Sequence, residues 1–384
     1  MIVAMQLGRW GVVCAGTSNL YNLAMDKLSV APFVYTGHAG RVLFGAGSLG
    51  HLEREITLLG AKRALVLSTP EQAAQADDLA SRLGARCAGV FARAVMHVPV
   101  ETARQARDEA ARVGADCAIA IGGGSTTGLG KAIALESALP ILAIPTTYAG
   151  SEMTAIYGIT EGGQKKTGRD ARVLPKTVIY DPELTLGLPT AMSATSGMNA
   201  IAHAVEALYA VDANPVISMM SEEGIRALAQ GLPMVMKNPR DIEARTLCLY
   251  GAWLCGMALN GTSMALHHKL CHTLGGTFNL PHAETHTVVL PHAAAYNAKA
   301  APEAMARVAR ALGAPVSADA ARALYDLEVT LGTPRALKDL GMPESGLDQA
   351  ADLAAANPYA NPVPIERAAI RQLLDNAFHG RVPA

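Results

Sequence analysis

Short apolar runs alternate with amphipathic stretches along the first half of the chain. Apolar runs bounded by glycine, proline or polar residues are typical of buried strands. Between the earlier runs, residues 53–61, 71–85 and 100–115 have apolar positions at helical spacing. The predicted strands are Arg41–Phe44, Ala64–Leu67, Cys117–Ile121, Pro140–Ile144 and Thr177–Tyr180. This alternation predicts an α/β domain with a parallel sheet wrapped by helices.

The pattern changes after Asp181 and Pro182, where the strand signal stops and long Ala- and Leu-rich stretches begin near Thr195. We expect three parts: residues 1–30 as an N-terminal extension or start-site artefact, residues 31–188 as an α/β domain, and residues 189–384 as an all-α domain. The 23 residues from Thr246 to His268 contain no Asp, Glu, Lys or Arg, which is long enough for a membrane span. Because glycines and polar residues interrupt them, a buried helix with a break is favoured.

Composition limits the partners and the cellular compartment that we expect for this protein. The 32 Lys+Arg and 33 Asp+Glu residues give a net charge of −1, which leaves no basic surface for nucleic acid. The six cysteines are scattered and form no CxxC pair, so they are expected to be free thiols in a reducing cytoplasm. Only Arg9 precedes the short apolar run near the start, which does not match a signal peptide. A cytoplasmic protein without nucleic-acid or membrane partners is expected.

Two glycine-rich turns compete as the phosphate site. Residues 45–50 match G-x-G-x-x-G between a predicted strand and a helix. The acidic residue that binds a ribose hydroxyl is expected about 20 residues later, at the end of the next strand. That strand end carries Thr69, and the first acid is Glu71. A dinucleotide turn and a purely structural turn both remain open for residues 45–50.

The second turn follows a fully apolar strand and opens a helix. Three consecutive glycines, Gly122, Gly123 and Gly124, allow backbone N–H groups to approach an anion, and Ser125 adds a hydroxyl. The next strand ends in a segment with Thr146, Thr147 and Ser151. Parallel strands end at the same edge of a sheet, where open α/β sheets bind ligands. We therefore favour this second turn as the pyrophosphate site.

Histidines concentrate in one segment: six of the 11 fall within the 26 residues from 267 to 292. His268 and His272 are four apart on a predicted helix and so share one face, as do Asn199 and His203 further upstream. His282 follows a helix break at residues 279–281 and returns toward the same point. Two helical pairs and a loop histidine are typical of a site assembled from separate elements. For His267, His286 and His292 we favour ordinary core or partner-facing positions.

These motifs resemble the iron-containing alcohol dehydrogenase family. The likeness starts near residue 33 and rests on GGGS (122–125), IPTT…GSE (144–152), DPEL (181–184), GMNAIAHAVEAL (197–208) and HHKLCHTLGGTFNLPH (267–282). The resemblance implies a dehydroquinate-synthase-like fold, NADH or NADPH as cofactor, and a homodimer. The family's metal ligands, one Asp and three His, map onto Asn199, His203, His268 and His282, and His272 matches a further active-site histidine.

This sequence departs from the family pattern in ways that resemble its maleylacetate reductase branch. Asn199 replaces the ligand Asp, Gly128 replaces an Asp after GGGS, and TTYAGSE is one residue shorter than its family counterpart. The branch implies reduction of the carbon–carbon double bond of maleylacetate, a dicarboxylate, to 3-oxoadipate in aromatic compound degradation. A neutral amide weakens metal binding, so no metal requirement is expected. The alternatives are a metal-dependent alcohol dehydrogenase with Asn199 still on iron or zinc, a cyclase of the dehydroquinate-synthase type, and a non-enzymatic nucleotide sensor.

The resemblance also implies roles for individual residues. His272 is expected to donate or relay a proton, and His203, His268 and His282 to form a pocket for an oxyanion and carboxylates. Lys166 is expected to contact the cofactor. Since Thr69 stands where NAD-selective members carry an Asp, NADPH is expected to be tolerated.

Overall fold

The structure, a computed structural model, describes residues 33–37, 40–162, 164–315, 319–356 and 359–383. The predicted extension, residues 1–30, lies outside the described residues. All described helices and strands belong to one compact unit, Tyr35–Ala384. The last strand ends at Tyr180 and the first long helix of the C-terminal part begins at Thr190. The domain division at residues 188 and 189 remains a prediction.

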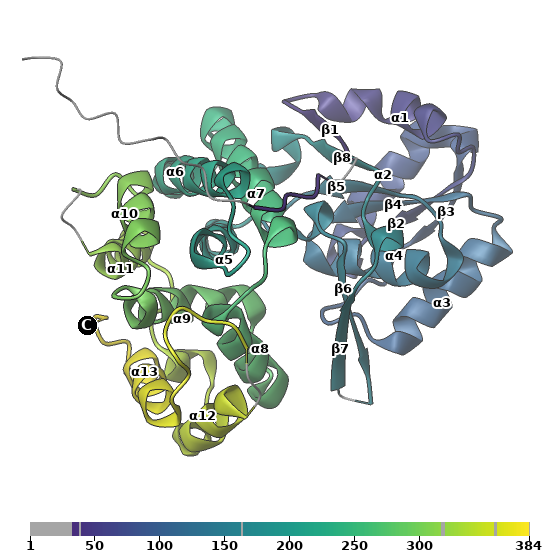
Figure 1. The fold of residues 1–384 in the computed structure, drawn as a ribbon. Helices are drawn as coiled ribbons and strands as arrows, with labels where there is room; N and C mark the ends of the chain where they lie inside the picture. Colours follow the sequence, from purple (N-terminus) through teal and green to yellow (C-terminus); the bar gives the residue numbers. More distant parts are fainter. Residues whose placement is uncertain (1–32, 38–39, 163, 316–318, 357–358, 384) are drawn as a thin grey trace, which may run out of the picture. The chain divides into compact units, whose positions relative to one another are not determined.

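A six-stranded, fully parallel sheet forms the core of the N-terminal part (Figure 1). The five predicted strands are confirmed to within one residue at each end. A sixth strand, β3, was missed because Gly89 and a half-buried edge position weaken its apolar signal. In spatial order the strands are β1 (Arg41–Phe44), β8 (Thr177–Tyr180), β5 (Ile141–Pro145), β4 (Cys117–Gly122), β2 (Ala64–Leu67) and β3 (Cys87–Phe91).

Helices cover both faces of this sheet because successive strand residues point to opposite sides. Val66 packs in one cluster with apolar residues of α1 (Leu52–Leu58) and α2 (Ala73–Leu83). Its neighbours Leu65 and Leu67 pack in another with α3 (Val100–Arg112) and α4 (Gly124–Ser137). The predicted parallel sheet between two layers of helices is therefore confirmed.

The strand order contains a reversal between β2 and β4. From β2 the chain continues to β3 on one side, whereas from β4 it continues to β5 on the other. The loops after two such neighbouring strands diverge and leave a crevice at their carboxyl ends, where α/β sheets bind ligands. Thr69 follows β2, and the three-glycine turn follows β4.

A two-stranded antiparallel hairpin, β6 (Ile156–Glu161) and β7 (Gln164–Arg169), stands apart from the large sheet (Figure 1). The sequence analysis missed it because its residues alternate without a continuous apolar run. Pro99 bridges to Thr160, which connects the hairpin to the segment that follows β3.

The C-terminal part is helical in the described residues, as predicted. Helix α5 begins at Thr190, before the expected start near Thr195, because Pro189 stands directly before its first turn. The break predicted within residues 246–268 is confirmed, since α7 ends at Gly261 and α8 begins at Leu266. No described helix is long and apolar enough to cross a membrane. The helices are α5 (Thr190–Tyr209), α6 (Pro215–Lys237), α7 (Ile242–Gly261), α8 (Leu266–Phe278), α9 (His282–Asn297), α10 (Pro302–Ala311), α11 (Ala320–Leu331), α12 (Leu347–Ala355) and α13 (Arg367–His379).

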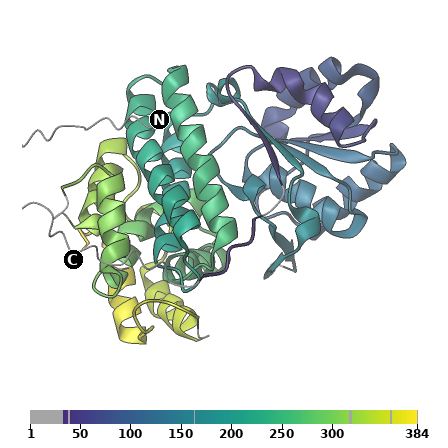
Figure 2. The same ribbon diagram turned by 45° about the horizontal axis from the view of Figure 1, so that its top comes forward.

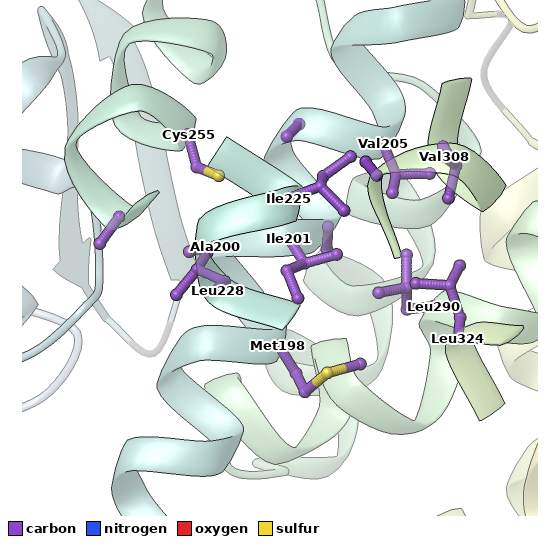
Figure 3. Close-up of a cluster of buried hydrophobic side chains, with 14 of the residues drawn as sticks. Met198, Ala200, Ile201, Val205, Ile225, Leu228, Cys255, Leu290, Val308 and Leu324 are labelled. Atoms are coloured by element: carbon purple, nitrogen blue, oxygen red, sulfur yellow. The ribbon is translucent and has the colours of Figure 1, made fainter. Parts of the chain in front are cut away.

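Helix α5 lies at the centre of this part, beside α6 and α7 (Figures 1 and 2). Its residues from Ser193 to Tyr209 are all buried. Small residues bring α6 and α7 close together: a Cβ on Gly224 would lie 2.8 Å from the sulfur of Cys255. Figure 3 shows the resulting core, in which Ile201 and Val205 of α5 pack with side chains of α6, α9, α10 and α11. A rigid, buried α5 is what holds Asn199 and His203 in place.

Candidate active site

The turn at residues 45–50 already binds a carboxylate of the protein itself. Gly47 adopts φ +76°, and its N–H donates to Asp181 Oδ1 at 3.2 Å, while the N–H of Leu49 donates to Asp181 Oδ2 at 3.0 Å. Asp181 follows β8, the neighbour of β1 in the sheet. Because these N–H groups are engaged, the geometry favours the structural interpretation of this turn over the dinucleotide one.

The three-glycine turn has the geometry of an anion site. Gly122 has φ +148°, and a Cβ there would lie 2.5 Å from Thr126 Oγ1 and 2.7 Å from Gln72 Oε1. A Cβ on Gly123 would lie 3.0 Å from Thr147. Helix α4 begins at Gly124, and the first N–H groups of a helix have no partner within the helix. The glycines are thus required by the close packing of the turn, which leads into the N-terminus of a 14-residue helix, a position that favours an anion.

The predicted cofactor residues fall partly around this turn. Thr146 donates its N–H to the carbonyl of Gly122 at 3.0 Å, and its hydroxyl accepts from Gln72 Nε2 at 2.9 Å. Gln72 was missed by the sequence analysis, since a lone Gln after a strand gives no distinctive signal. Ser125 lies half-buried in the first turn of α4. Lys166, in contrast, is on the exposed hairpin, with Nζ 2.7 Å from Glu161 Oε2.

A buried lysine, which was not predicted, fastens the loop that follows β5. Lys131 of α4 donates from Nζ to the carbonyls of Ser151 and Ile156, at 2.6 and 2.7 Å, and to Thr154 Oγ1 at 2.9 Å. Burial lowers the pKa of Lys131 to about 7. Ser151 is therefore held through its backbone. The signal available in the sequence was a single cation inside the apolar helix start LGKAIAL.

The same loop connects the sheet edge to the histidines. The N–H of Tyr148 donates to Ser196 Oγ on α5 at 3.0 Å. Gly150 adopts φ +79°, and a Cβ there would lie 3.1 Å from Gly256 Cα and 3.6 Å from His203 Nδ1. Only a glycine allows the loop to pass so close to α7 and to His203, so the predicted cofactor loop and His203 are neighbours.

The structure brings the four predicted histidines together from α5, α8 and α9. The rings of His203 and His268 are 5.2 Å apart between centroids, and those of His268 and His272 are 6.2 Å apart. His282 and His272 are exposed, whereas His203 and His268 are buried. Burial lowers the pKa of His203 well below its usual value, and repulsion by His268 and His282 lowers it further. The cluster is thus open to solvent on one side.

Three buried polar atoms in this cluster have no hydrogen-bond partner among the described residues: Asn199 Oδ1, His203 Nδ1 and His268 Nε2. Each is an atom type that binds divalent metal ions. An amide oxygen and neutral imidazoles carry no negative charge, so this set lacks the electrostatic attraction that an aspartate ligand would add. The donor set is thus of a type that can bind a divalent ion, with a lower affinity expected than for a set that contains a carboxylate.

A second layer of side chains lies behind this cluster. His267 Nε2 and His286 Nδ1 are at hydrogen-bond distance, 3.0 Å, and Cys271 Sγ lies 3.7 Å from His267 Nε2. All three are buried, as the core interpretation of the two histidines predicts. Their nitrogen and sulfur atoms lie within 4.8 Å of one another, a donor set of the metal-binding kind. The His286 ring is 4.9 Å from that of His268, so this layer contacts the predicted site.

One buried carboxylate touches the cluster and was missed. Glu206 lies on α5, three residues after His203, and its Oε2 is 2.6 Å from His268 Nδ1. The available signal was that Glu206 is the only charged residue within the 20 residues of α5. Burying an isolated acid in an apolar helix costs free energy unless the acid is hydrogen-bonded. The sequence therefore implied that Glu206 has a hydrogen-bond partner.

This fold and cluster define the class of protein. The family profile described as "Iron-containing alcohol dehydrogenase" matches residues 39–182, and that described as "Fe-containing alcohol dehydrogenase family, C-terminal" matches residues 193–378. The chain belongs to the iron-containing alcohol dehydrogenase family.

Within that family, three relatives are informative. A maleylacetate reductase from Burkholderia cepacia is 64% identical over 92% of this chain and 99% of its own length. The crystal structure of maleylacetate reductase from Agrobacterium tumefaciens is 55% identical, with a TM-score of 0.89, over 92% of this chain and all of that one. An iron-containing alcohol dehydrogenase from Corynebacterium glutamicum is 43% identical, with a TM-score of 0.86, over 91% of this chain and 97% of its own.

Proposed function

We propose that this protein reduces the carbon–carbon double bond of maleylacetate to form 3-oxoadipate, with NADH or NADPH as reductant and without a metal ion. It is an oxidoreductase of aromatic compound degradation. The observation that carries the metal-free part of the proposal is the neutral side chain of Asn199, which is buried on α5 one helical turn before His203. The maleylacetate reductases at 53–64% identity support the substrate. A homodimer is part of the proposal.

The chemistry of the substrate explains why a neutral site suffices. Reducing a carbonyl group directly leaves a localised, strongly basic alkoxide, which favours a Lewis acid. Reducing a double bond conjugated to a ketone leaves an enolate, whose charge is delocalised and far less basic. Hydrogen-bond donors in a fixed position can stabilise such an anion. The replacement of a ligand Asp by Asn199 is compatible with the second reaction and unfavourable for the first.

The cofactor site would use the turn Gly122–Gly124 and the hydroxyls of Ser125, Thr146 and Thr147 for the pyrophosphate. Bound NADH or NADPH would supply the hydride. Tight backbone geometry at Gly122 and the N-terminus of α4 fit that group. Ser151, held by Lys131, and Thr69, after β2, would border the nicotinamide and adenosine ends.

The protein's own residues would then handle the charge and the proton. His203 and His282 would donate hydrogen bonds to the enolate oxygen and to the carboxylates, and His268 would complete the lining of that pocket. His272 would protonate the enolate carbon: its exposed position lets it recover the proton from water, and it lies one helical turn from His268. One hydride and one proton together convert the double bond into a single bond.

Removal of metal is expected to leave the activity intact. Protein dialysed against a strong chelator should oxidise the reduced nicotinamide cofactor with maleylacetate at the rate of the untreated protein, because no step needs a Lewis acid. The assay follows cofactor absorbance, with metal content measured on the same samples. A loss of activity that iron or zinc restores would instead favour the metal-dependent alcohol dehydrogenase, for which the 43% identical C. glutamicum dehydrogenase gives the precedent.

Both nicotinamide cofactors are expected to be used. Thr69 places no carboxylate at the end of β2, although Glu71 lies nearby: a hydrogen bond from its own backbone N–H, and then one from Thr69, lower the pKa of Glu71. One charge contact is worth roughly 1 to 3 kcal/mol, so kcat/KM for NADH and NADPH should agree within about a hundredfold. Glu71→Gln, which removes that charge, should shift the ratio toward NADPH. A stronger preference for NADH in the unmodified protein would contradict this argument.

A further inference from the structure

Glu206 is fully buried, and every hydrogen bond recorded for it comes from a donor near the start of α8 or from α5 itself. Its Oε1 accepts from the N–H of His267 at 2.7 Å and lies 3.5 Å from Tyr209 OH. Its Oε2 accepts from the N–H of Ala265 at 3.1 Å and of His268 at 3.4 Å. The same oxygen lies 2.6 Å from His268 Nδ1. One carboxylate therefore binds both the backbone and the side chain of the same histidine.

These contacts determine which nitrogen of His268 carries hydrogen toward Glu206. Backbone N–H groups only donate, so the carboxylate is their acceptor. The short contact with Nδ1 is then an N–H to carboxylate bond, and charge-assisted bonds of this kind are short and strong. The ring can no longer rotate freely, and Nε2 is left as the nitrogen available for a ligand. Nε2 of His268 indeed has no partner among the described residues.

We propose that Glu206 is a positioning residue for the reduction: it accepts from Nδ1–H of His268 and so fixes the ring and its tautomer, with Nε2 left facing the substrate pocket as a hydrogen-bond acceptor. This inference rests on the proposed function. The site also contains a negative charge although Asn199 is neutral, because the Glu206 carboxylate lies behind the imidazole of His268. Partners that orient a ligating or catalytic histidine in this way typically change activity by about 10- to 100-fold when they are removed.

A purely structural role is the competing explanation, because Glu206 also satisfies N–H groups at the start of α8 and lies where a negative charge favours a helix N-terminus. The two explanations predict different effects of removing the Glu206 carboxylate. A structural role predicts lower thermal stability with normal turnover of the folded fraction. A positioning role predicts a lower kcat in protein that is folded.

The experiment compares Glu206→Gln with Glu328→Gln. Glu328 of α11 is a second carboxyl group buried in the helical part, and burial raises its pKa well above the usual value. It therefore controls for the loss of a buried carboxyl group away from the histidines. We expect Glu206→Gln to lower kcat by about 10- to 100-fold with little change in KM for the reduced cofactor, and Glu328→Gln to retain the kcat of the unmodified protein. Wild-type kcat in folded Glu206→Gln, or an equal loss in Glu328→Gln, would overturn the proposal.

A second measurement needs neither substrate nor a stable Glu206 variant. A short N–H to carboxylate bond gives a far-downfield proton resonance, which nitrogen-15 labelling of histidine assigns to an imidazole. The unmodified protein should show this resonance and His268→Gln should lack it. Its absence from the unmodified protein would overturn the positioning role. Because no maleylacetate is present, failure of the proposed activity leaves this result interpretable, and inactivity of the unmodified protein with maleylacetate would count against the proposed function alone.

Discussion

Replacing His272 by alanine is expected to lower kcat for maleylacetate by roughly 10²- to 10⁴-fold, the usual contribution of a general acid. KM for the reduced nicotinamide cofactor should change little, because His272 is on α8 and the cofactor residues are on the loops after β2, β4 and β5. The physical reason is the loss of a proton donor that is both exposed to water and adjacent to His268. Steady-state kinetics with both substrates varied separate kcat from the two KM values.

A matched control is His379, an exposed histidine on α13 whose Nδ1 lies 3.0 Å from the carbonyl of Asp375. His379→Ala should retain the turnover of the unmodified protein. If His272→Ala also turns over normally, the proton must come from another group, and the role proposed for His272 is wrong. A rise in KM for maleylacetate with unchanged kcat would mean that His272 only binds the substrate.

The second large effect is expected from Asn199→Asp, which introduces the carboxylate that the family resemblance implies at this metal-ligand position. A negative charge one helical turn from His203 should raise the affinity of the histidine cluster for a divalent ion by about 10²-fold or more. The same charge lies where the substrate's carboxylates and the enolate are proposed to bind, so kcat/KM for maleylacetate should fall. Titration with Zn²⁺ in a calorimeter measures the first effect, and the nicotinamide assay the second.

Asn214→Asp is the control for a new buried carboxylate. Asn214 is buried at the N-cap of α6, where its Oδ1 accepts from the N–H of Ile217 at 3.1 Å, and an aspartate serves equally well there. This variant should bind no more Zn²⁺ than the unmodified protein. If Asn199→Asp also binds no more, the four side chains do not converge on one ion. If the unmodified protein already binds Zn²⁺ tightly, the argument from the neutral amide is wrong.

The sequence alone was sufficient where a local pattern carries the information. Continuous apolar runs located five strands of the parallel sheet to within one residue. A strand that is buried on both faces is apolar at nearly every position, so its ends are easy to recognise in the sequence. The i, i+4 pairs placed Asn199 with His203 and His268 with His272, because helical spacing is a property of the chain itself. A break within residues 246–268 and another at residues 279–281 were also visible, in polar residues, glycine and proline. The short runs of β3 and the hairpin β6–β7 were missed, since their stability comes from neighbouring strands.

Only the tertiary structure decided which of these local features meet. In the structure, N–H groups of the turn at residues 45–50 donate hydrogen bonds to Asp181, which is 132 residues away from Leu49 along the chain. The structure also brought Gly150 to within contact of Gly256 and His203, so that the loop after β5 reaches the histidine cluster. The sequence also could not indicate which residue is the hydrogen-bond partner of Glu206, because His268 lies on another helix, 62 residues later. Periodicity records which face of an element is buried, but contacts between distant residues depend on how the elements pack, and no single stretch of sequence contains that information.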